Sequence, residues 1–178
     1  MEIIKTELAG VHVIRPRVFE DARGGFVKTF HAPTFQAAGL KFEPREEFYS
    51  DSRRNVIRGM HFQLPPHTQT RLVYCLRGRV LDVVVDLRRN SPTFRRVLTR
   101  ELSATNREML FIPEGLAHGF LALDELSLMI YLASPVHSPP HDAGIAWDSI
   151  DFEWPVKNPI LSDRDRNFPA LKDFQSPF

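Results

Sequence analysis

Cysteine is almost absent from the chain, because Cys75 is the only one and lies within the apolar run LVYCL. A single thiol cannot form an intrachain disulfide or supply a cluster of zinc ligands, and an apolar setting is typical of a buried free thiol. We therefore expect a protein of a reducing compartment that is not held together by disulfides.

An excess of one charge and a long hydrophobic run are also missing. The chain has 23 Lys and Arg against 22 Asp and Glu, for a formal net charge of +1, and its basic residues are scattered. This distribution leaves no basic patch for a nucleic-acid duplex or an anionic membrane, although it is compatible with a small anionic ligand. The N-terminal stretch MEIIKTELAG has no long apolar core, and no membrane-spanning run follows it. The sequence therefore predicts a cytoplasmic protein that binds no nucleic acid and no membrane.

What the chain does contain is a series of short β-type runs. At 178 residues, 43% hydrophobic and 25% charged, it has the size of one globular domain, residues 1–178, with a sizeable core. Strands are expected at Val11–Pro16, Gly25–His31, Asn55–Gln63, Arg71–Leu76, Val80–Leu87, Arg95–Leu102, Glu108–Pro113, His118–Leu123 and Ser127–Ala133. Many short strands, separated by turn sequences such as EDARGG and NSPT, favour an all-β sandwich or barrel.

Three further segments have a distinct character. Ala32–Gly39 is the clearest helix candidate, with proline near its start and glycine at its end. In Val80–Leu87, apolar residues alternate with positions that include two aspartates, which predicts a strand buried on one face. The segment after Ser134 is rich in proline and then carries apolar anchors without a clear period. We expect this tail to pack on the barrel as a covering segment.

The stretch Asn55–Gln63, NVIRGMHFQ, combines the apolar pattern of a buried strand with several polar groups. Successive side chains of an extended chain point to opposite faces, so Arg58 is expected on one side and His61 with Gln63 on the other. His61 and Gln63 would then face the same space. Polar groups in such a strand mark a candidate site, and a core histidine bonded to a backbone carbonyl is the alternative.

Several motifs occur in a fixed order along the chain: RGGF, IRGMHFQ, TQTRLV, VVVDLRRNSPTF, IPEGLAHGF, WP and SDRD. From about Val13 to Leu171 they resemble the RmlC-like family of nucleotide-sugar epimerases, dTDP-4-dehydrorhamnose 3,5-epimerase and its relatives. The resemblance implies a cupin-type β-barrel (jelly roll) with short helices, a homodimer, and no metal or organic cofactor. It also implies an activity: epimerisation of a nucleotide-diphosphate 4-keto-6-deoxyhexose at C3, C5 or both, in deoxysugar and cell-surface polysaccharide biosynthesis.

The implied chemistry accounts for the residue types in these motifs. Removing a hydrogen next to a ketone leaves an enolate, whose negative charge lies mainly on the former carbonyl oxygen. Such a site needs a base, a group that stabilises this oxygen, and an acid on the opposite face. By the resemblance, His61 is the base, and Asp165 of SDRD is the carboxylate that fixes its tautomer and favours the imidazolium. A surface loop aspartate is the alternative for Asp165.

The other two catalytic roles fall to Arg71 and Tyr131. Arg71 occupies a position that is commonly lysine in the family. Either cation can stabilise a developing oxyanion, but arginine keeps its proton, which argues against proton donation by this residue. Tyr131, in MIYLAS, matches the tyrosine that reprotonates the enolate from the other side, and a strand tyrosine at the mouth of the barrel is the alternative.

Substrate binding is expected around this centre. The resemblance assigns the anionic diphosphate to Arg23, Arg58 and Arg164, because an arginine can engage two phosphate oxygens at once. Phe26 would stack on the nucleotide base. The remaining expected substrate-binding residues are Gln63, Phe48, His118 and His137.

Departures from the family pattern leave the exact substrate open. Thymidine-nucleotide relatives usually have a glutamate two residues beyond the RGxF phenylalanine and a Gln-x-Asn before the first pocket strand. Those positions are Lys28, Glu46 and Phe48 here. Phenylalanine cannot hydrogen-bond a pyrimidine edge, so dTDP, CDP and GDP all stay candidates. His137 stands where relatives often have a second tyrosine, which leaves the number of inverted centres open.

Two other protein classes share part of the pattern. A metal-dependent cupin uses a close histidine pair, a carboxylate and a distant histidine, but HFQ supplies only one histidine of the pair and no carboxylate follows at the required distance. A non-catalytic sugar-binding module would keep the arginines and Phe26 but could lose the base. The joint presence of His61, Asp165 and Tyr131 favours the cofactor-independent enzyme.

Overall fold

The computed structural model describes all of residues 1–178 and consists mainly of strands. The strands are β1 (Glu2–Lys5), β2 (His12–Arg15), β3 (Val18–Asp21), β4 (Gly24–Val27), β5 (Glu46–Ser52), β6 (Ile57–Gln63), β7 (Thr70–Arg77), β8 (Arg79–Asp86), β9 (Val97–Ser103), β10 (Met109–Ile112), β11 (Leu116–Ala122), β12 (Ser127–Ser134) and β13 (Asp142–Gly144). The helices are α1 (Ala32–Ala37) and α2 (Asp163–Arg166), and two 3₁₀ turns span Pro139–His141 and Trp147–Ser149. Both helices are far too short to span a membrane.

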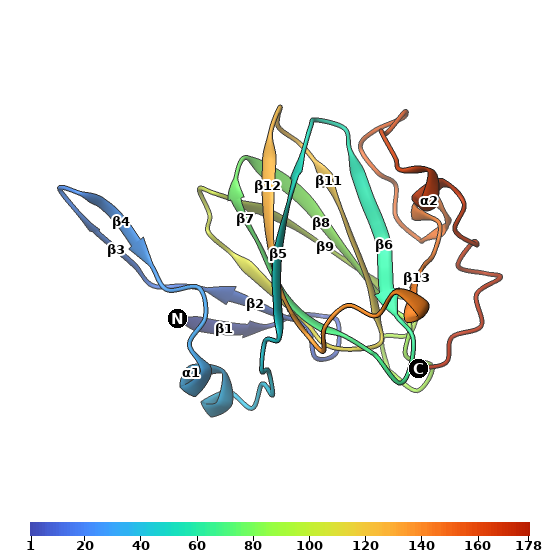
Figure 1. Ribbon diagram of the computed structural model, residues 1–178, viewed down its shortest axis with the longest axis horizontal. Coiled ribbons are helices and arrows are strands. Elements are labelled where there is room, and N and C mark those ends of the chain that lie inside the picture. The colour runs from blue at the N-terminus through green and yellow to red at the C-terminus, as the bar shows by residue number, and fades with distance from the viewer.

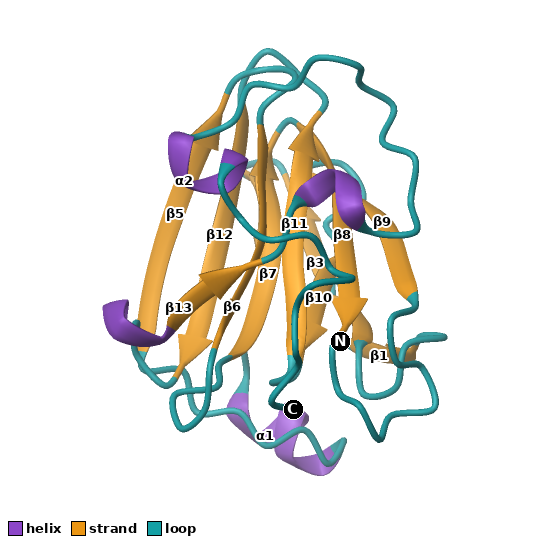
Figure 2. Ribbon diagram, turned by 90° about the vertical axis from the view of Figure 1, so that its right-hand side faces the viewer, coloured by secondary structure: helices purple, strands orange, loops and turns teal.

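Eleven of the thirteen strands form two antiparallel sheets that face each other as the layers of a jelly roll, and β3 and β4 pair only with each other (Figures 1 and 2). The six-stranded sheet has the order β1-β2-β10-β7-β12-β5, and the five-stranded sheet has the order β13-β6-β11-β8-β9. Strands that are distant in sequence, such as β2 and β10, are neighbours, because the chain crosses repeatedly between the layers. The predicted all-β barrel is confirmed.

Strand β8 is buried on both faces, so the prediction of one buried face is wrong. Val84 belongs to the apolar core between the sheets, whereas Val83 packs in a second core on the outer side of the five-stranded sheet. Trp154 and Leu171 of the C-terminal segment cover this second core. The tail therefore packs on the barrel as expected, and its cover makes the outer face of β8 a buried one.

Four strands were not expected from the sequence: β1, β3, β5 and β13. The strand predicted at Gly25–His31 ends at Val27, because β4 pairs only with β3 in a short hairpin and the chain then leads into a helix. That helix, α1, begins at Ala32 as predicted and has proline in its first turn. Its Phe35 packs on the outer face of the six-stranded sheet.

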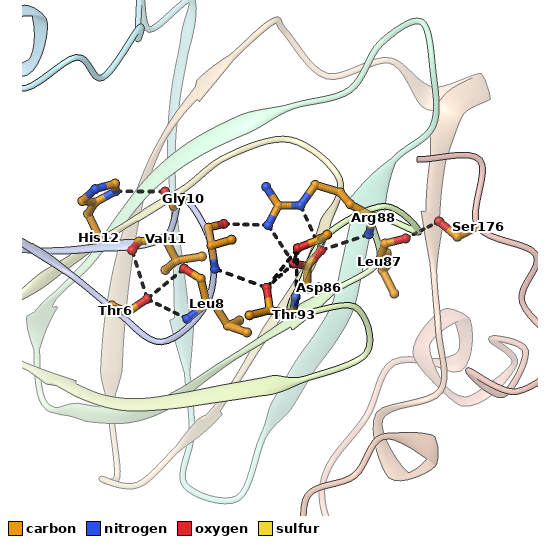
Figure 3. A network of polar contacts seen from close by, with 12 residues as sticks. Thr6, Leu8, Gly10, Val11, His12, Asp86, Leu87, Arg88, Thr93 and Ser176 are labelled. Carbon is orange, nitrogen blue, oxygen red and sulfur yellow. Dashed lines mark hydrogen bonds and ion pairs between the residues drawn. The ribbon is translucent and has the colours of Figure 1, made fainter.

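The loop after β8 is fastened to the chain ends by polar contacts (Figure 3). Asp86 is fully buried, and its carboxylate accepts hydrogen bonds from Arg88 Nη2 at 2.7 Å and Thr93 Oγ1 at 2.6 Å. Arg88 also donates to a carbonyl of the N-terminal loop, and Ser176 Oγ donates to the carbonyl of Leu87. These bonds compensate the buried charge, which would otherwise destabilise the fold.

The hairpin β3–β4 projects from the barrel, at the end of the molecule opposite α2 (Figure 1). Phe19 and Phe26 are register partners on it, with ring centroids 6.3 Å apart, and both are exposed. Arg23 lies at the turn of the hairpin, where it pairs with Asp21 at 2.6 Å.

Candidate active site

A pocket of about 430 Å³ opens between the two sheets. It is lined by 13 residues, which include these predicted site residues: Phe48, Arg58, His61, Arg71, His118, Tyr131, His137 and Arg164. His61 belongs to the five-stranded sheet through β6, and Tyr131 belongs to the six-stranded sheet through β12. The pocket is therefore walled by side chains from both layers of the jelly roll.

Arg58 and His61 both face this pocket, contrary to the alternation predicted for β6. In the pairing with β11, His118 lies opposite His61, and Phe120 lies opposite Arg58, so three steps on β6 match two steps on β11. The extra residue is a β-bulge at Gly59, where φ is +145° and a Cβ would lie 2.6 Å from the backbone of β11. The prediction of opposite faces is wrong, because a bulge reverses the alternation beyond it.

His61 and Asp165 form a hydrogen-bonded pair. His61 Nε2 lies 2.8 Å from Asp165 Oδ1, and the Gly59 N–H donates to Asp165 Oδ2 at 3.2 Å. The carboxylate is placed by α2, whose N-cap Ser162 accepts the Asp165 N–H at 3.1 Å. When Nε2 donates to Asp165, Nδ1 is the unprotonated nitrogen that can accept a proton.

The surroundings keep Asp165 ionised beside the imidazole. Burial alone raises the pKa of this carboxyl, but the hydrogen bonds from His61, Gly59 and the helix cap outweigh it and hold the pKa below its usual value. The negative charge stabilises the imidazolium that forms when His61 takes a proton. Phe168 packs edge-on against the imidazole, with centroids 5.7 Å apart, and was not singled out in the sequence.

Arg71 is a fixed cation beside this pair. Its Nε donates to Gln69 Oε1 at 2.9 Å, and its Nη1 donates to the carbonyl of His61 at 3.3 Å. Burial lowers the pKa of the guanidinium from its ordinary value, but an arginine stays protonated at neutral pH. The group is therefore suited to stabilise negative charge and unsuited to donate a proton.

Tyr131 faces the pocket from the opposite sheet. Its hydroxyl lies 3.4 Å from Ser50 Oγ, and burial raises the pKa of the phenol above its ordinary value. The phenol is therefore protonated near neutral pH and can act as a proton donor. The ring of Phe48 stacks on it.

A second histidine–aspartate pair lies next to the first. His118 Nε2 is 2.8 Å from Asp82 Oδ2, and both side chains are buried. Burial raises the pKa of the Asp82 carboxyl, while His118 lowers it less strongly, and Asp82 Oδ1 has no protein partner. The sequence suggested His118 as a pocket residue but did not indicate its buried partner.

Arg58 and Arg164 bring two more cations to the pocket. Arg58 Nε donates to Ser52 Oγ at 3.0 Å, and the guanidinium is exposed. Arg164 donates to both oxygens of Asp142, at 2.6 and 3.0 Å, so its charge is largely compensated. His137 Nε2 also lies 3.2 Å from Asp142, which places it at the same rim.

Four predicted residues do not line the pocket of this chain, and one of them, Asp165, is buried behind His61. Arg23 and Phe26 lie on the projecting hairpin (Figure 1). Gln63 is buried outside the pocket, where its Nε2 donates to the carbonyl of His67 at 2.8 Å and its Oε1 accepts a backbone N–H at 2.6 Å. Both ends of the amide bind backbone, so the prediction that Gln63 shares a space with His61 is wrong.

Sequence reasoning missed five lining residues: Glu46, Ser50, Gln69, Phe120 and Asp142. Glu46 and Ser50 lie on the inner face of β5 with Phe48, so recognition of that strand and its alternation would have found them. Asp142 stands in a proline-rich segment without any periodic pattern, and nothing in the sequence separates it from a surface residue.

The arrangement can move protons at a carbon atom held between the sheets. The base with its ionised partner comes from one side, the phenol from the other, and Arg71 supplies a fixed positive charge. No group of three or more His, Cys, Asp or Glu side chains is arranged to hold a metal ion.

Comparisons with known proteins show the family of the chain. The model of the family described as dTDP-4-dehydrorhamnose 3,5-epimerase matches residues 5–173. A Shigella flexneri protein named dTDP-4-dehydrorhamnose 3,5-epimerase is 44% identical over 176 residues, which cover 97% of each chain.

Solved structures give the same result at the level of the fold. The dTDP-4-dehydrorhamnose 3,5-epimerase of Bacillus anthracis, with TDP and PPi bound, matches with a TM-score of 0.93 at 36% identity, over 96% of this chain and 99% of that one. The dTDP-6-deoxy-D-glucose-3,5-epimerase of Legionella pneumophila, in complex with dTDP-4-keto-L-rhamnose, matches with a TM-score of 0.93 at 31% identity, over 98% and 94% of the two chains. With a family match that spans nearly its whole length, the chain belongs to the dTDP-4-dehydrorhamnose 3,5-epimerase family.

Proposed function

We propose that the chain epimerises a dTDP-linked 4-keto-6-deoxyhexose at C3 and C5, as a step of deoxysugar biosynthesis. The observation that carries the proposal is the position of His61 and Tyr131 on opposite sheets, across one pocket. Inversion at a carbon next to a ketone needs a base on one face and an acid on the other. Membership of the family supports the same activity.

Each pocket group then has one task. Nδ1 of His61 takes the proton from the carbon, and Asp165 stabilises the resulting imidazolium. Arg71 stabilises the negative charge on the enolate oxygen. Tyr131 gives its proton to the opposite face of the carbon and recovers one from solvent, while His61 releases the proton it took. The sugar thus loses one proton and gains one, and no electrons are transferred.

The names of the relatives support dTDP as the nucleotide. Phe48 alone left CDP and GDP open, because its side chain cannot hydrogen-bond a pyrimidine edge. A single-centre epimerase is the second candidate, since His137 stands at the pocket rim where family members often have tyrosine. Proton removal at only one of the two carbons would support that alternative.

The decisive test is deuterium incorporation from heavy water into dTDP-, CDP- and GDP-4-keto-6-deoxyglucose, read separately at C3 and C5 by NMR. We expect exchange and inversion at both carbons with the dTDP sugar and slower turnover with the other two. His61→Asn should abolish exchange at both carbons, because a positioned base contributes about 10²–10⁴-fold. A chelator should not change the activity. Exchange that survives in His61→Asn would overturn the assignment of the base.

We propose further that two copies form a homodimer in which the hairpin of one supplies Arg23 and Phe26 to the pocket of the other. The projecting, exposed position of both residues supports this assembly. Mixing His61→Asn with Arg23→Glu tests it, because a hybrid dimer contains one pocket with its base and an intact partner hairpin. Activity above that of either variant alone is expected after subunit exchange. A monomer in sedimentation, or no complementation, contradicts the proposal.

We propose that the chain is one domain, residues 1–178, of a reducing, cytoplasmic compartment. Cys75 is free and buried, and burial raises the pKa of its thiol to about 11, so it is unreactive. A free thiol of this kind supports the reducing location.

A further inference from the structure

Phe48 and Tyr131 are direct partners across two strands. Tyr131 of β12 pairs with Phe48 of β5 in the antiparallel register, so both side chains leave the sheet on the same face. Their ring centroids lie 4.7 Å apart, and the ring planes differ by 8°, which is a stacked pair.

This stack is the main support of the phenol on the pocket side. Tyr131 is 7% exposed and Phe48 is 41% exposed, so Phe48 shields the phenol from the open part of the pocket. The Tyr131 hydroxyl lies 3.4 Å from Ser50 Oγ, which is long for a hydrogen bond between two hydroxyls. The rings of His118 and Tyr131 meet edge to face, with their centroids 6.2 Å apart. Ring packing, rather than a strong hydrogen bond, therefore holds the hydroxyl in place.

Phe48 is also the only apolar side chain on the inner face of β5. Glu46, Ser50 and Ser52 share that face and offer polar groups to the pocket or to Arg58. Phe48 cannot hydrogen-bond a substrate, and one of its faces is occupied by Tyr131. Its strongest connection to the reaction runs through the acid.

We propose that Phe48 is a positioning residue for Tyr131, which aims the phenol at the enolate and keeps water away from it. The inference rests on the proposed function and deepens it. Without the ring of Phe48, the phenol gains freedom to move and water reaches its hydroxyl. The enolate then more often recovers its proton from the His61 imidazolium, on the face that the proton left. Proton removal depends on His61, Asp165 and Arg71, and no hydrogen bond or ring contact joins any of the three to the stack.

The test is Phe48→Ala with dTDP-4-keto-6-deoxyglucose in heavy water, with deuterium exchange and epimer formation measured as two separate rates. We expect the ratio of epimer formation to exchange to fall about tenfold or more, a fraction of the full contribution of a general acid. Phe48→Tyr retains a flat ring and should restore the wild-type ratio of the two rates. Tyr49→Ala removes the neighbouring ring from the outer face of β5 and should leave the ratio unchanged.

If Phe48 had a merely structural role, Phe48→Ala would lower exchange and epimer formation in equal proportion. An unchanged ratio of the two rates therefore overturns the proposal. If wild-type protein shows neither exchange nor epimer, the proposed function itself fails. The contact is then measured without substrate, from the tyrosinate absorbance of wild type and of Phe48→Ala, each after subtraction of the absorbance of the same protein with Tyr131→Phe. Because burial raises the pKa of the Tyr131 hydroxyl, opening the stack should move its ionisation to lower pH. An unchanged titration refutes the shielding.

Discussion

At the scale of single residues, the pair of His61 and Asp165 predicts that catalysis depends on the charge of Asp165. Asp165→Asn keeps the shape of the side chain but removes the charge that stabilises the imidazolium. The new amide can also turn its NH2 group toward the ring, where it would donate instead of accept. We expect kcat for both exchange and epimerisation to fall about 10²–10⁴-fold, with little change in KM. Steady-state kinetics measures this, and Asp163→Asn, exposed on the same helix, is the control. Near wild-type kcat in Asp165→Asn would show that the pair is not catalytic.

Arg71 separates the role of charge from that of proton donation. Arg71→Lys keeps a cation close to the carbonyl of His61, so we expect kcat within about tenfold of wild type. Arg71→Met fills similar space without charge and should lower kcat about 10²–10³-fold, the usual loss when one stabiliser of an oxyanion is removed. Measuring kcat of both variants under identical conditions separates the two roles. Equal losses in both would mean that the planar guanidinium, and not its charge, is what the reaction needs.

At the scale of elements, the sequence predicted most strands with an apolar buried face and missed β5, whose inner face is polar. Strand β5 carries Glu46, Ser50 and Ser52 inward because its inner face lines a polar pocket instead of the core. Its pattern therefore resembles a solvent-exposed loop. Strand β6 was found, but its bulge was not, because the bulge depends on close contact with β11 and not on composition.

The bulge of β6 can be tested through Gly59. A Cβ there would lie 2.6 Å from the Cα of Gly119, and φ is +145°, so Gly59→Ala must shift one of the strands. We expect the free energy of unfolding to fall by about 1–3 kcal/mol and the activity to be lost, because His61 turns away from the pocket. Urea denaturation and turnover measure both effects.

Gly39→Ala is the matched control for this substitution. Gly39 also has a positive φ, +74°, but nothing lies within 4 Å of its Cβ position, so only the backbone strain of about 1–2 kcal/mol applies. It should lose stability and keep its turnover. If Gly59→Ala retained turnover in the same way, the bulge would not be what orients His61.

At the scale of the whole molecule, ordered motifs were enough to predict the jelly roll and most of the pocket, but not the position of the hairpin that carries two of the expected site residues. Arg23 and Phe26 carry the family motif, yet their hairpin leaves the barrel (Figure 1). β3 and β4 pair only with each other, and motif order does not indicate that such a hairpin leaves the barrel. Likewise, the covered face of β8 depends on a tail with no periodic pattern.

The stability of the whole molecule should depend on pH through its buried carboxylates. Burial raises the pKa of Asp86, but hydrogen bonds from Arg88 and two hydroxyls outweigh it, and the pKa lies below its usual value. The pKa of Glu108 is likewise lowered, chiefly by its hydrogen bond from Arg100. The unfolded chain therefore binds protons first as the pH falls. The stabilisation is complete above the ordinary carboxyl pKa of about 4 and is lost as the pH falls through the folded values.

Urea midpoints should accordingly be nearly constant from about pH 6 to 8 and fall steeply below about pH 4.5. Asp86→Asn removes one of the contributing charges and leaves Arg88 without its anion, so we expect a loss of about 1–3 kcal/mol at pH 7. Because the variant no longer has that proton to bind, its loss relative to wild type should shrink as the pH approaches 3. Asp173→Asn, on the exposed C-terminal tail, should follow the wild-type curve throughout. A constant difference between Asp86→Asn and wild type at every pH would mean that Asp86 stabilises the loop through shape and hydrogen bonding alone, and not through its charge.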